Sequence, residues 1–292
     1  MVHRRAFLLT WTVFAGVAIN SPISAQSSSI RTAAATTTNA GDQRLTTVLS
    51  NWTTLGQRIE TFSCRFVRSD FDLGHQVESR GQGTIACQSD GRAVYSIEPV
   101  KDLEKLHSSR ANSRGQPFRL DAAKGETLYW ISGQIARINP DRWEYELFEV
   151  PEDFQHPGVV ETLESFDVVW TRLGCIERQV PGLIERDVER LNALYDWSLE
   201  SVSERQIILK GLPKHEAEKH HCSMLVVYLD PKTYLTQGTK IIDSAQSRET
   251  VHVFMETKVN AMPVSTLPSW APNIGGMTML TPPPLAPPAE EE

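Results

Sequence analysis

The chain has 292 residues, a length that suits one large domain or two small ones. Acidic residues outnumber basic residues by 36 to 29, which gives a formal net charge of −7. An acidic chain without a basic stripe argues against nucleic acid as a partner. We therefore expect no nucleic-acid partner.

The N-terminal segment 1–25 has the three parts of a secretory signal peptide. A basic start at Arg4 and Arg5 precedes an apolar run over 6–19, and small residues end at Ala25. The apolar run is shorter than the roughly 20 residues that cross a membrane. We expect cleavage after Ala25, a formal net charge of −9 after cleavage, and a periplasmic or extracellular location. With no longer apolar stretch elsewhere, we expect peripheral rather than integral membrane association.

A small polar leader at 26–41 is expected to be disordered, because it cannot bury a core. An amphipathic helix is predicted over 41–60, with Asp42 as the residue that caps its start. Its apolar residues fall on one helical stripe: Leu45, Val48, Leu49, Trp52, Leu55 and Ile59. This stripe predicts that one face of the helix is buried against the rest of the domain.

A long antiparallel hairpin is predicted next. Phe62, Cys64 and Phe66 alternate with other residues over 61–72, which is typical of a strand with one buried face. A turn signal at 73–76 leads into a second extended run. The hairpin therefore predicts the start of an antiparallel sheet.

The four cysteines permit two disulfides in an exported protein. A hairpin turn centred at 75–76 would place Cys64 opposite Cys87, close to disulfide reach. A bulge in the loop would instead break this register and leave both as buried thiols. Cys175 with Cys222 is then the remaining pair.

Short strands with tight turns continue after the hairpin and predict an antiparallel meander in an α+β fold. The predicted strands are 91–98, 117–121, 126–131, 134–139, 143–150, 197–202, 206–210, 221–230, 235–244 and 249–260. Two amphipathic helices are predicted to interrupt the meander, at 158–173 and 183–195.

The segment 263–292 is rich in proline and ends in acidic residues, so we expect a disordered tail without a helix or strand. The sequence thus divides into four parts: a signal peptide at 1–25, a leader at 26–41, an α+β domain at 42–262 and the tail at 263–292.

The residue sets that common enzymatic chemistries require are missing from the sequence. It has no GxSxG elbow, no glycine-rich phosphate loop and no CxxC pair. His215, His220 and His221 lie in one charged segment, but Lys219 occupies the position where a zinc-protease helix needs its second histidine. We expect a solvated loop there, and we predict no catalytic residue, no metal and no cofactor.

Large apolar residues on neighbouring strands are the best candidates for a binding site. They either form an ordinary core beneath the helices or line an apolar cleft. The candidate cleft residues are Phe62, Phe66, Tyr95, Trp130, Phe166 and Trp170.

Several motifs resemble the periplasmic outer-membrane lipoprotein carrier (LolA/LolB-like) superfamily over 42–260. They are the amphipathic N-terminal helix, Phe62-x-x-x-Phe66, Gly81-Gln-Gly-x-Ile85, the segment 95–99 and the sequence KGETLYW at 124–130. The nearest likeness is to an exported planctomycete family of unknown function. The resemblance implies a curved, incomplete antiparallel β-barrel of about 11–12 strands around an apolar cavity for acyl chains. It also implies that the N-terminal helix and a two-helix insertion cover the concave face.

One departure from the carrier concerns the end of the second strand. The carrier has a basic residue followed by proline there, and this arginine helps to hold its lid closed. The present chain has Gln88-Ser89-Asp90-Gly91 instead. The resemblance therefore supports the fold more strongly than the lipoprotein-ferrying mechanism.

Three hypotheses follow for the function. The first is a monomeric, non-enzymatic exported protein that holds a lipid, an acyl chain or a lipidated protein in an apolar cleft between sheet and helices. The alternative is a structural or interaction domain of the cell envelope with a solid core and no ligand. A second alternative is a hydrolase with an unrecognised site that uses His215, His220 or His252.

Overall fold

The structure of the protein is a computed structural model that describes residues 34–89, 92–131, 134–149, 180, 182–261 and 274–280. Residues up to 39 form one compact unit and residues from 40 onward form a second, and the contacts given below are those of the second unit. The predicted helix at 158–173, with Phe166 and Trp170, lies outside the described residues, as does Cys175.

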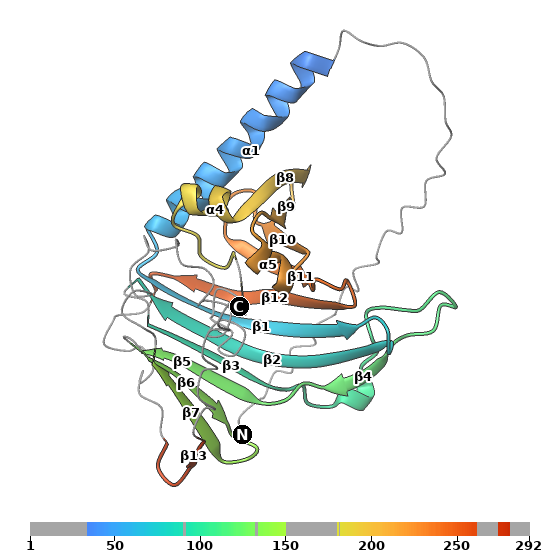
Figure 1. The fold of residues 1–292 in the computed structure, drawn as a ribbon, viewed down its shortest axis with the longest axis vertical. Coiled ribbons are helices and arrows are strands. Elements are labelled where there is room, and N and C mark those ends of the chain that lie inside the picture. The colour runs from blue at the N-terminus through green and yellow to red at the C-terminus, as the bar shows by residue number, and fades with distance from the viewer. Residues whose placement is uncertain are drawn as a thin grey trace, which may run out of the picture. The chain divides into compact units, whose positions relative to one another are not determined.

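The described residues form a mostly-sheet α+β fold, as predicted (Figure 1). The curved sheet has 13 strands rather than the expected 11–12. The first elements are α1 (Ala34–Gln57), β1 (Thr61–Asp72), β2 (Val77–Gln88), β3 (Ala93–Pro99), the short 3₁₀ helix η1 (Leu103–Lys105), β4 (Arg119–Ala122), β5 (Glu126–Ile131), β6 (Gln134–Asn139) and β7 (Glu144–Glu149). The later elements are α4 (Val188–Leu194), β8 (Tyr195–Val202), β9 (Ile207–Pro213), α5 (Glu216–His221), β10 (Met224–Leu229), β11 (Thr236–Ile242), β12 (Arg248–Val259) and β13 (Thr278–Leu280).

The sheet is open rather than closed into a barrel, because its strand order runs from β13 at one end to β8 at the other. The order is β13-β7-β6-β5-β3-β2-β1-β12-β11-β10-β9-β8, with β4 paired to β2 off this path. Two pairs are parallel, β2 with β4 and β7 with β13, and the others are antiparallel. β4 pairs with 77–80 of β2, which is the part that β3 leaves unpaired. The long hairpin of β1 and β2 thus occupies the middle of the sheet.

Several elements differ from the sequence-based predictions. The helix α1 begins at Ala34, inside the predicted disordered leader, so Asp42 lies within the helix and does not cap its start. The chain forms β13 within the predicted disordered tail, in a stretch that contains no proline. It forms the short helix α5 within the predicted charged loop. The helix α4 begins only at Val188, because the Asp187 side chain accepts hydrogen bonds from the first free backbone N–H groups, those of Glu189 and Arg190.

The predicted disulfide between Cys64 and Cys87 is wrong. The pairing of β1 with β2 places Cys64 opposite Ile85 and Cys87 opposite Phe62, so the two cysteines are diagonal neighbours and both are free thiols. The four-residue turn at 73–76 sets this register. Its geometry is fixed by the Asp72 carboxylate, which accepts a hydrogen bond from the backbone N–H of His75 at 2.9 Å. The predicted pair of Cys175 and Cys222 stays a prediction.

Two apolar clusters lie on one face of the sheet, and α1 contributes to both. The predicted stripe of α1 is buried: Trp52 is 2% exposed and Leu49 is 3% exposed. Trp52 packs edge-on against Trp197 in the cluster over β8, β9 and β10. Ile59, just after α1, packs into the second cluster, over β1, β2, β3, β5 and β12. The helix therefore joins the two clusters.

Gly83 of β2 is needed because the ring of Phe66 lies directly over it. A methyl group at Gly83 would lie 2.6 Å from Cζ of Phe66 and 2.0 Å from the backbone oxygen of Ser96. We expect Gly83→Ala to lower the free energy of unfolding by about 1–3 kcal/mol, because it forces the strands apart. Urea denaturation measures this change.

The matched control for Gly83→Ala is Gly41→Ala in α1, where nothing lies within 4 Å of the added methyl group. Because alanine loses less backbone entropy in a helix, this variant should be more stable by about 0.5–1 kcal/mol. Equal effects at the two glycines would contradict the close packing of Phe66 on β2.

Candidate functional site

Four of the predicted cleft residues lie on the same face of the sheet. In the register of the central strands, Cys64 is opposite Ile85, Ile85 is opposite Tyr95, and Tyr95 is opposite Leu128. Residues directly opposite each other project from the same face, and so do residues two apart on one strand. The four are Phe62, Phe66, Tyr95 and Trp130. We call the cluster that contains them the central apolar cluster.

The innermost members of the central apolar cluster are packed as a core. Phe66 and Tyr95 are 0% exposed and Phe62 is 2% exposed. The rings of Phe66 and Tyr95 stack with centroids 4.9 Å apart. Trp130 lies at the border of the cluster and is half-buried. The predicted residues are therefore brought together, with three of them closed off from solvent.

The end of α1 is pinned to the segment 182–187, which we call the cap segment. A methyl group at Gly56 would lie 1.8 Å from the backbone oxygen of Glu185, so only glycine permits this approach. Nε2 of Gln57 donates a hydrogen bond to the Arg186 carbonyl at 2.9 Å, and Nη2 of Arg186 donates one to the Ile59 carbonyl at 3.0 Å. The cap segment and the end of α1 thus form one unit beside the central apolar cluster.

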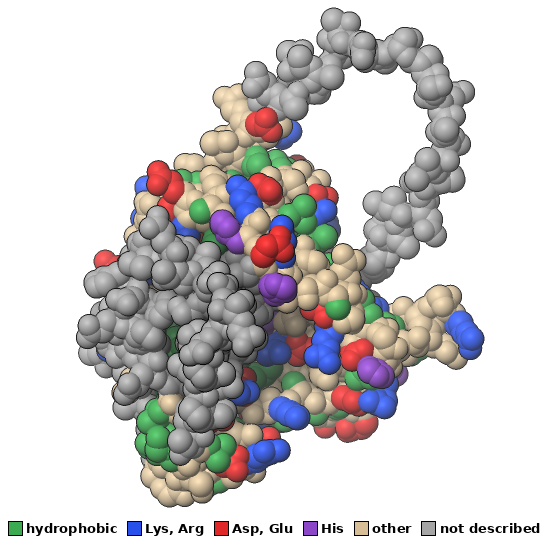
Figure 2. Space-filling model, in the orientation of Figure 1, with side chains coloured by type: hydrophobic (Ala, Val, Ile, Leu, Met, Phe, Trp, Pro, Cys, Tyr) green, Lys and Arg blue, Asp and Glu red, His purple; other side chains and the backbone are tan. Residues whose placement is uncertain are grey.

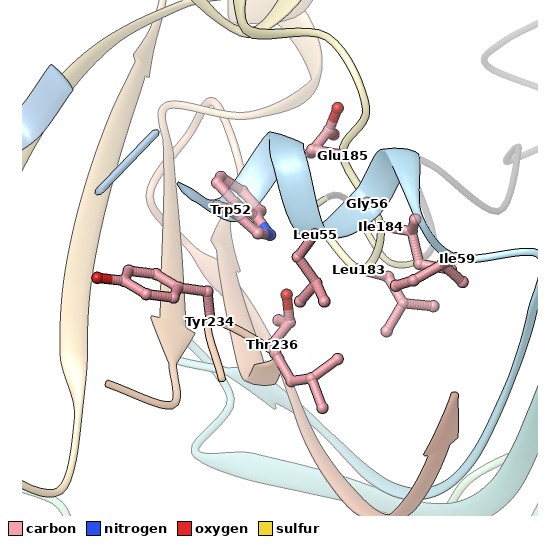
Figure 3. Close-up of a pocket in the computed structure, with 10 residues that line it drawn as sticks. Trp52, Leu55, Gly56, Ile59, Leu183, Ile184, Glu185, Tyr234 and Thr236 are labelled. Carbon is pink, nitrogen blue, oxygen red and sulfur yellow. The ribbon is translucent and has the colours of Figure 1, made fainter. Parts of the chain in front are cut away.

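A shallow, open pocket lies where the cap segment, α1 and the start of β11 meet, and it encloses no space for a water molecule (Figure 3). It is lined by Trp52, Leu55, Gly56, Ile59, Leu183, Ile184, Glu185, Tyr234, Leu235 and Thr236. Figure 3 shows Leu55 projecting from α1 toward Thr236, whereas the Tyr234 hydroxyl points away. Ligand pockets usually enclose about 300–1,000 Å³. This open pocket encloses no such volume, so the surrounding side chains would have to move apart to hold a long acyl chain.

Polar side chains border the central apolar cluster on the same face. Nε of Arg68 donates a hydrogen bond to Asp70 at 3.0 Å, and its Nη1 donates one to the Tyr95 hydroxyl at 3.4 Å. Burial raises the pKa of Tyr95 to about 12, so the phenol stays protonated. His252 lies opposite Arg68 on β12 and is 1% exposed. Burial, together with the charge of Arg68, lowers the pKa of His252 to about 3.

The buried His252 predicts a pH dependence of stability. Its pKa rises from about 3 in the folded chain to the ordinary 6.5 on unfolding, so below pH 6.5 only the unfolded chain binds this proton. The stability from neutral His252 is complete above pH 6.5 and is lost as the pH falls toward the folded pKa. We expect the free energy of unfolding to fall by up to about 1.4 kcal/mol per pH unit through this effect.

The measurement is urea denaturation between pH 6.5 and 4.5, a range at or above the ordinary pKa of a glutamate. In the variant His252→Leu, the free energy of unfolding should depend less on pH, because leucine cannot bind a proton. Identical slopes for the natural chain and His252→Leu would contradict a neutral, buried imidazole.

A buried carboxylate, that of Glu78, lies on the opposite face of the same strands. Glu78 is 0% exposed and accepts hydrogen bonds from the hydroxyls of Ser69 at 2.8 Å and Ser108 at 2.6 Å, and from Nε of Arg80 at 2.7 Å. Burial alone would raise the pKa of Glu78, but the hydrogen bonds from these three side chains outweigh it and hold the pKa below its usual value. Glu78 therefore fastens the loop before β4 to β1 and β2.

The histidines proposed for a hydrolase do not assemble an acid–base pair within the described ranges. Nε2 of His215 lies 3.1 Å from the carbonyl oxygen of Ala193, and neither ring nitrogen of His252 has a hydrogen-bond partner. His220 lies on α5. The part of the chain that the structure describes holds no group of three or more His, Cys, Asp and Glu residues placed to bind a metal ion.

Acidic and basic side chains are intermixed over the face of the molecule shown in Figure 2. Among the helices that the structure describes, none has the length and apolar character that crossing a membrane requires.

Sequence reasoning missed the polar border of the central apolar cluster. The sequence indicated His252 only as a candidate acid or base. It gave no indication of Thr239, which lies opposite His252 on β11. A histidine within an apolar-alternating strand is the one signal that could have pointed to a buried imidazole. Nothing in the sequence pairs that histidine with Thr239, because this depends on the register between β11 and β12.

No family model matches the sequence, and no curated protein matches it. Solved structures do resemble the fold. An uncharacterised conserved protein from Thermus thermophilus is 7% identical, with a TM-score of 0.41 over 82% of this chain and 100% of its own. The lipoprotein LppX of Mycobacterium tuberculosis is 8% identical, with a TM-score of 0.39 over 76% of this chain and 99% of its own.

A LolA superfamily protein from Nitrosomonas europaea is 8% identical, with a TM-score of 0.32 over 75% of this chain and 94% of its own. This neighbour is described as a protein of the LolA superfamily, the superfamily that the sequence motifs resemble. At these identities and TM-scores the likeness concerns the fold, so the proposals below rest on the residues of this chain.

Proposed function

We propose that the chain is a non-enzymatic, exported binding protein that holds an acyl chain, free or attached to a lipid or protein, against the central apolar cluster. The observation that carries this proposal is the shared apolar face of β1, β2, β3, β5 and β12 beside the cap segment. An acyl chain buried there would gain about 0.8 kcal/mol per CH₂ group. We also propose that a two-helix insertion covers this face of the sheet.

The proposal includes the domain organisation predicted from the sequence. The segment 1–25 directs export, 42–262 forms the binding domain, and the tail from 263 adds β13 to the edge of the sheet. We further propose that the exported chain is a monomer that associates with membranes peripherally. The intact mass of the exported protein should correspond to a chain that begins at Gln26.

A second candidate is a structural or interaction domain with a solid core. The near-complete burial of Phe62, Phe66 and Tyr95 favours it, as does the small volume of the pocket beside the cap segment. The two candidates differ in one measurable respect, because only the first takes up an apolar chain.

The test uses the full exported chain, purified and freed of lipid. Binding of decanoate, dodecanoate and tetradecanoate is measured by displacement of a fluorescent fatty acid. Affinity should rise by about 0.8 kcal/mol for each added CH₂ group. Native mass spectrometry of the protein before lipid removal should show bound acyl species.

Two neighbouring residues of β12 give a matched pair of variants. Phe254 is 8% exposed and belongs to the central apolar cluster, whereas Val253 projects from the opposite face and is 50% exposed. Phe254→Ala should weaken binding by about tenfold or more, and Val253→Ala should leave it unchanged. Affinity that does not depend on chain length, or no binding at all, would favour the solid-core candidate.

A further inference from the structure

A row of three polar side chains crosses the face that carries the central apolar cluster. Arg68 of β1 lies opposite His252 of β12, and His252 lies opposite Thr239 of β11. Opposed residues on neighbouring strands project from the same face with their Cβ atoms about 4.5–5.5 Å apart. The His252 ring lies 5.7 Å from that of Phe66 and 6.1 Å from that of Phe254. The polar row therefore directly adjoins apolar aromatic rings.

Two members of the row have no protein partner among the described residues. Both ring nitrogens of His252 and the hydroxyl oxygen of Thr239 are buried without a hydrogen bond. His252 is 1% exposed and Thr239 is 0% exposed. Folded proteins satisfy the great majority of their buried polar groups, and an apolar pair of the same shape would be more stable at this position. The two groups therefore indicate a ligand that supplies the missing hydrogen bonds.

The chemistry of the row defines the ligand. A neutral imidazole offers one N–H donor, a threonine hydroxyl offers another, and the Arg68 guanidinium adds a permanent positive charge. Donors beside a cation suit an oxyanion, and the adjoining rings of Phe66 and Phe254 suit a hydrocarbon chain. A single molecule with both parts is a long-chain fatty acid.

We propose that Arg68, His252 and Thr239 form a head-group subsite for the carboxylate of a fatty acid whose chain lies along the central apolar cluster. This proposal rests on the proposed function and specifies its ligand. Asp70 already neutralises part of the Arg68 charge, so the fatty-acid carboxylate competes with Asp70 for the guanidinium. The donors of His252 and Thr239 favour the ligand in that competition.

The burial of the subsite has a kinetic consequence. A carboxylate reaches His252 only when neighbouring side chains move apart, because His252 is almost completely buried. Association should therefore be slower than a diffusion-limited encounter, and a stopped-flow trace with a fluorescent fatty acid should show a rate that levels off as ligand concentration rises.

The first test measures stability without ligand, and it distinguishes a binding residue from a structural one. The variants His252→Leu and Thr239→Val should each raise Tm by about 2–4 °C, because they remove an unpaired buried polar group. Thr236→Val on the same strand is the control, because the Thr236 hydroxyl donates a hydrogen bond to the Gly182 carbonyl at 2.7 Å. This control should lower Tm, and a similar loss at Thr239 would overturn the subsite.

The second test compares palmitate with hexadecanol and methyl palmitate, which share its chain but carry no negative charge. The natural chain should bind palmitate about tenfold more tightly than either. His252→Leu and Thr239→Val should lose this preference and keep the affinity for hexadecanol. A single matched series of titrations with the delipidated full chain measures all of these affinities.

The outcomes separate this proposal from the one on which it rests. Equal affinity of the natural chain for palmitate and hexadecanol overturns the carboxylate subsite and leaves acyl-chain binding intact. A preference for palmitate that persists in both variants overturns the assignment to His252 and Thr239. Failure of every compound to bind overturns the proposed function itself.

Discussion

Glu78→Gln should lower the free energy of unfolding by about 3–5 kcal/mol, because it leaves the buried charge of Arg80 without its partner. The Arg80 side chain is 15% exposed, and the Glu78 side chain is 0% exposed. The substitution preserves the shape of the side chain but replaces an oxygen that accepts hydrogen bonds with an NH₂ group that cannot accept them. Urea denaturation at neutral pH measures the change.

The control for Glu78→Gln is Asp121→Asn on the adjacent strand β4. Asp121 pairs with Arg119 at 2.9 Å, but the two side chains are 43% and 72% exposed. Exposed ion pairs of this kind contribute about 0–1 kcal/mol. Comparable losses for the two variants would show that Glu78 does not fasten the loop before β4.

Phe66→Ala should lower the free energy of unfolding by about 3–5 kcal/mol, because the ring is completely buried and its removal leaves a cavity. Phe66 packs against Tyr95 on one side and lies over Gly83 of β2. The adjacent Val67, which is half-buried on the opposite face, provides the control substitution Val67→Ala with a smaller loss.

This second prediction also separates two roles for Phe66. A side chain that lines an open cleft exposes its ring to water, so its removal has a small effect on stability. A loss below about 1 kcal/mol for Phe66→Ala would therefore indicate an open cleft in the unliganded protein. A loss in the expected range would mean that an acyl chain must displace packed side chains to enter.

The sequence predicted the strands well because alternation reflects a sheet with one buried face. β5 and β6 begin and end at the predicted residues, and Phe62, Cys64 and Phe66 share the buried side. The order of strands in the sheet could not be predicted from the sequence. The pairing of β1 with β12 joins residues almost 200 positions apart, such as Phe62 and Val259. No local pattern encodes such a contact.

The errors at the hairpin and at α4 have a common physical cause. In both, one aspartate carboxylate accepts backbone hydrogen bonds and thereby sets where an element ends or begins: Asp72 at the turn after β1 and Asp187 before α4. Shifting the turn by one residue changes the sum of opposed positions by two, which moved Cys87 from opposite Cys64 to opposite Phe62. Apolar periodicity does not contain this information.

The binding site was predictable only in part. Alternation assigned Phe62 and Phe66 to one face of a strand, but the extent of their burial depends on α1 and the cap segment. The row of Arg68, His252 and Thr239 exists only because β1, β12 and β11 are adjacent in one particular register. No local pattern in the sequence indicates such a row.

The diagonal placement of Cys64 and Cys87 matters most while the chain is still folding. Burial, and for Cys64 also the proximity of Cys87, raises the pKa of both thiols, that of Cys87 to about 12. Since the thiolate is the reactive form, the finished hairpin protects both sulfurs from oxidants. An unfolded chain has no such protection, and a bridge formed at that stage would force the hairpin out of register. The hairpin must therefore form before the two thiols are oxidised. A stable β1–β2 pairing favours this order of events.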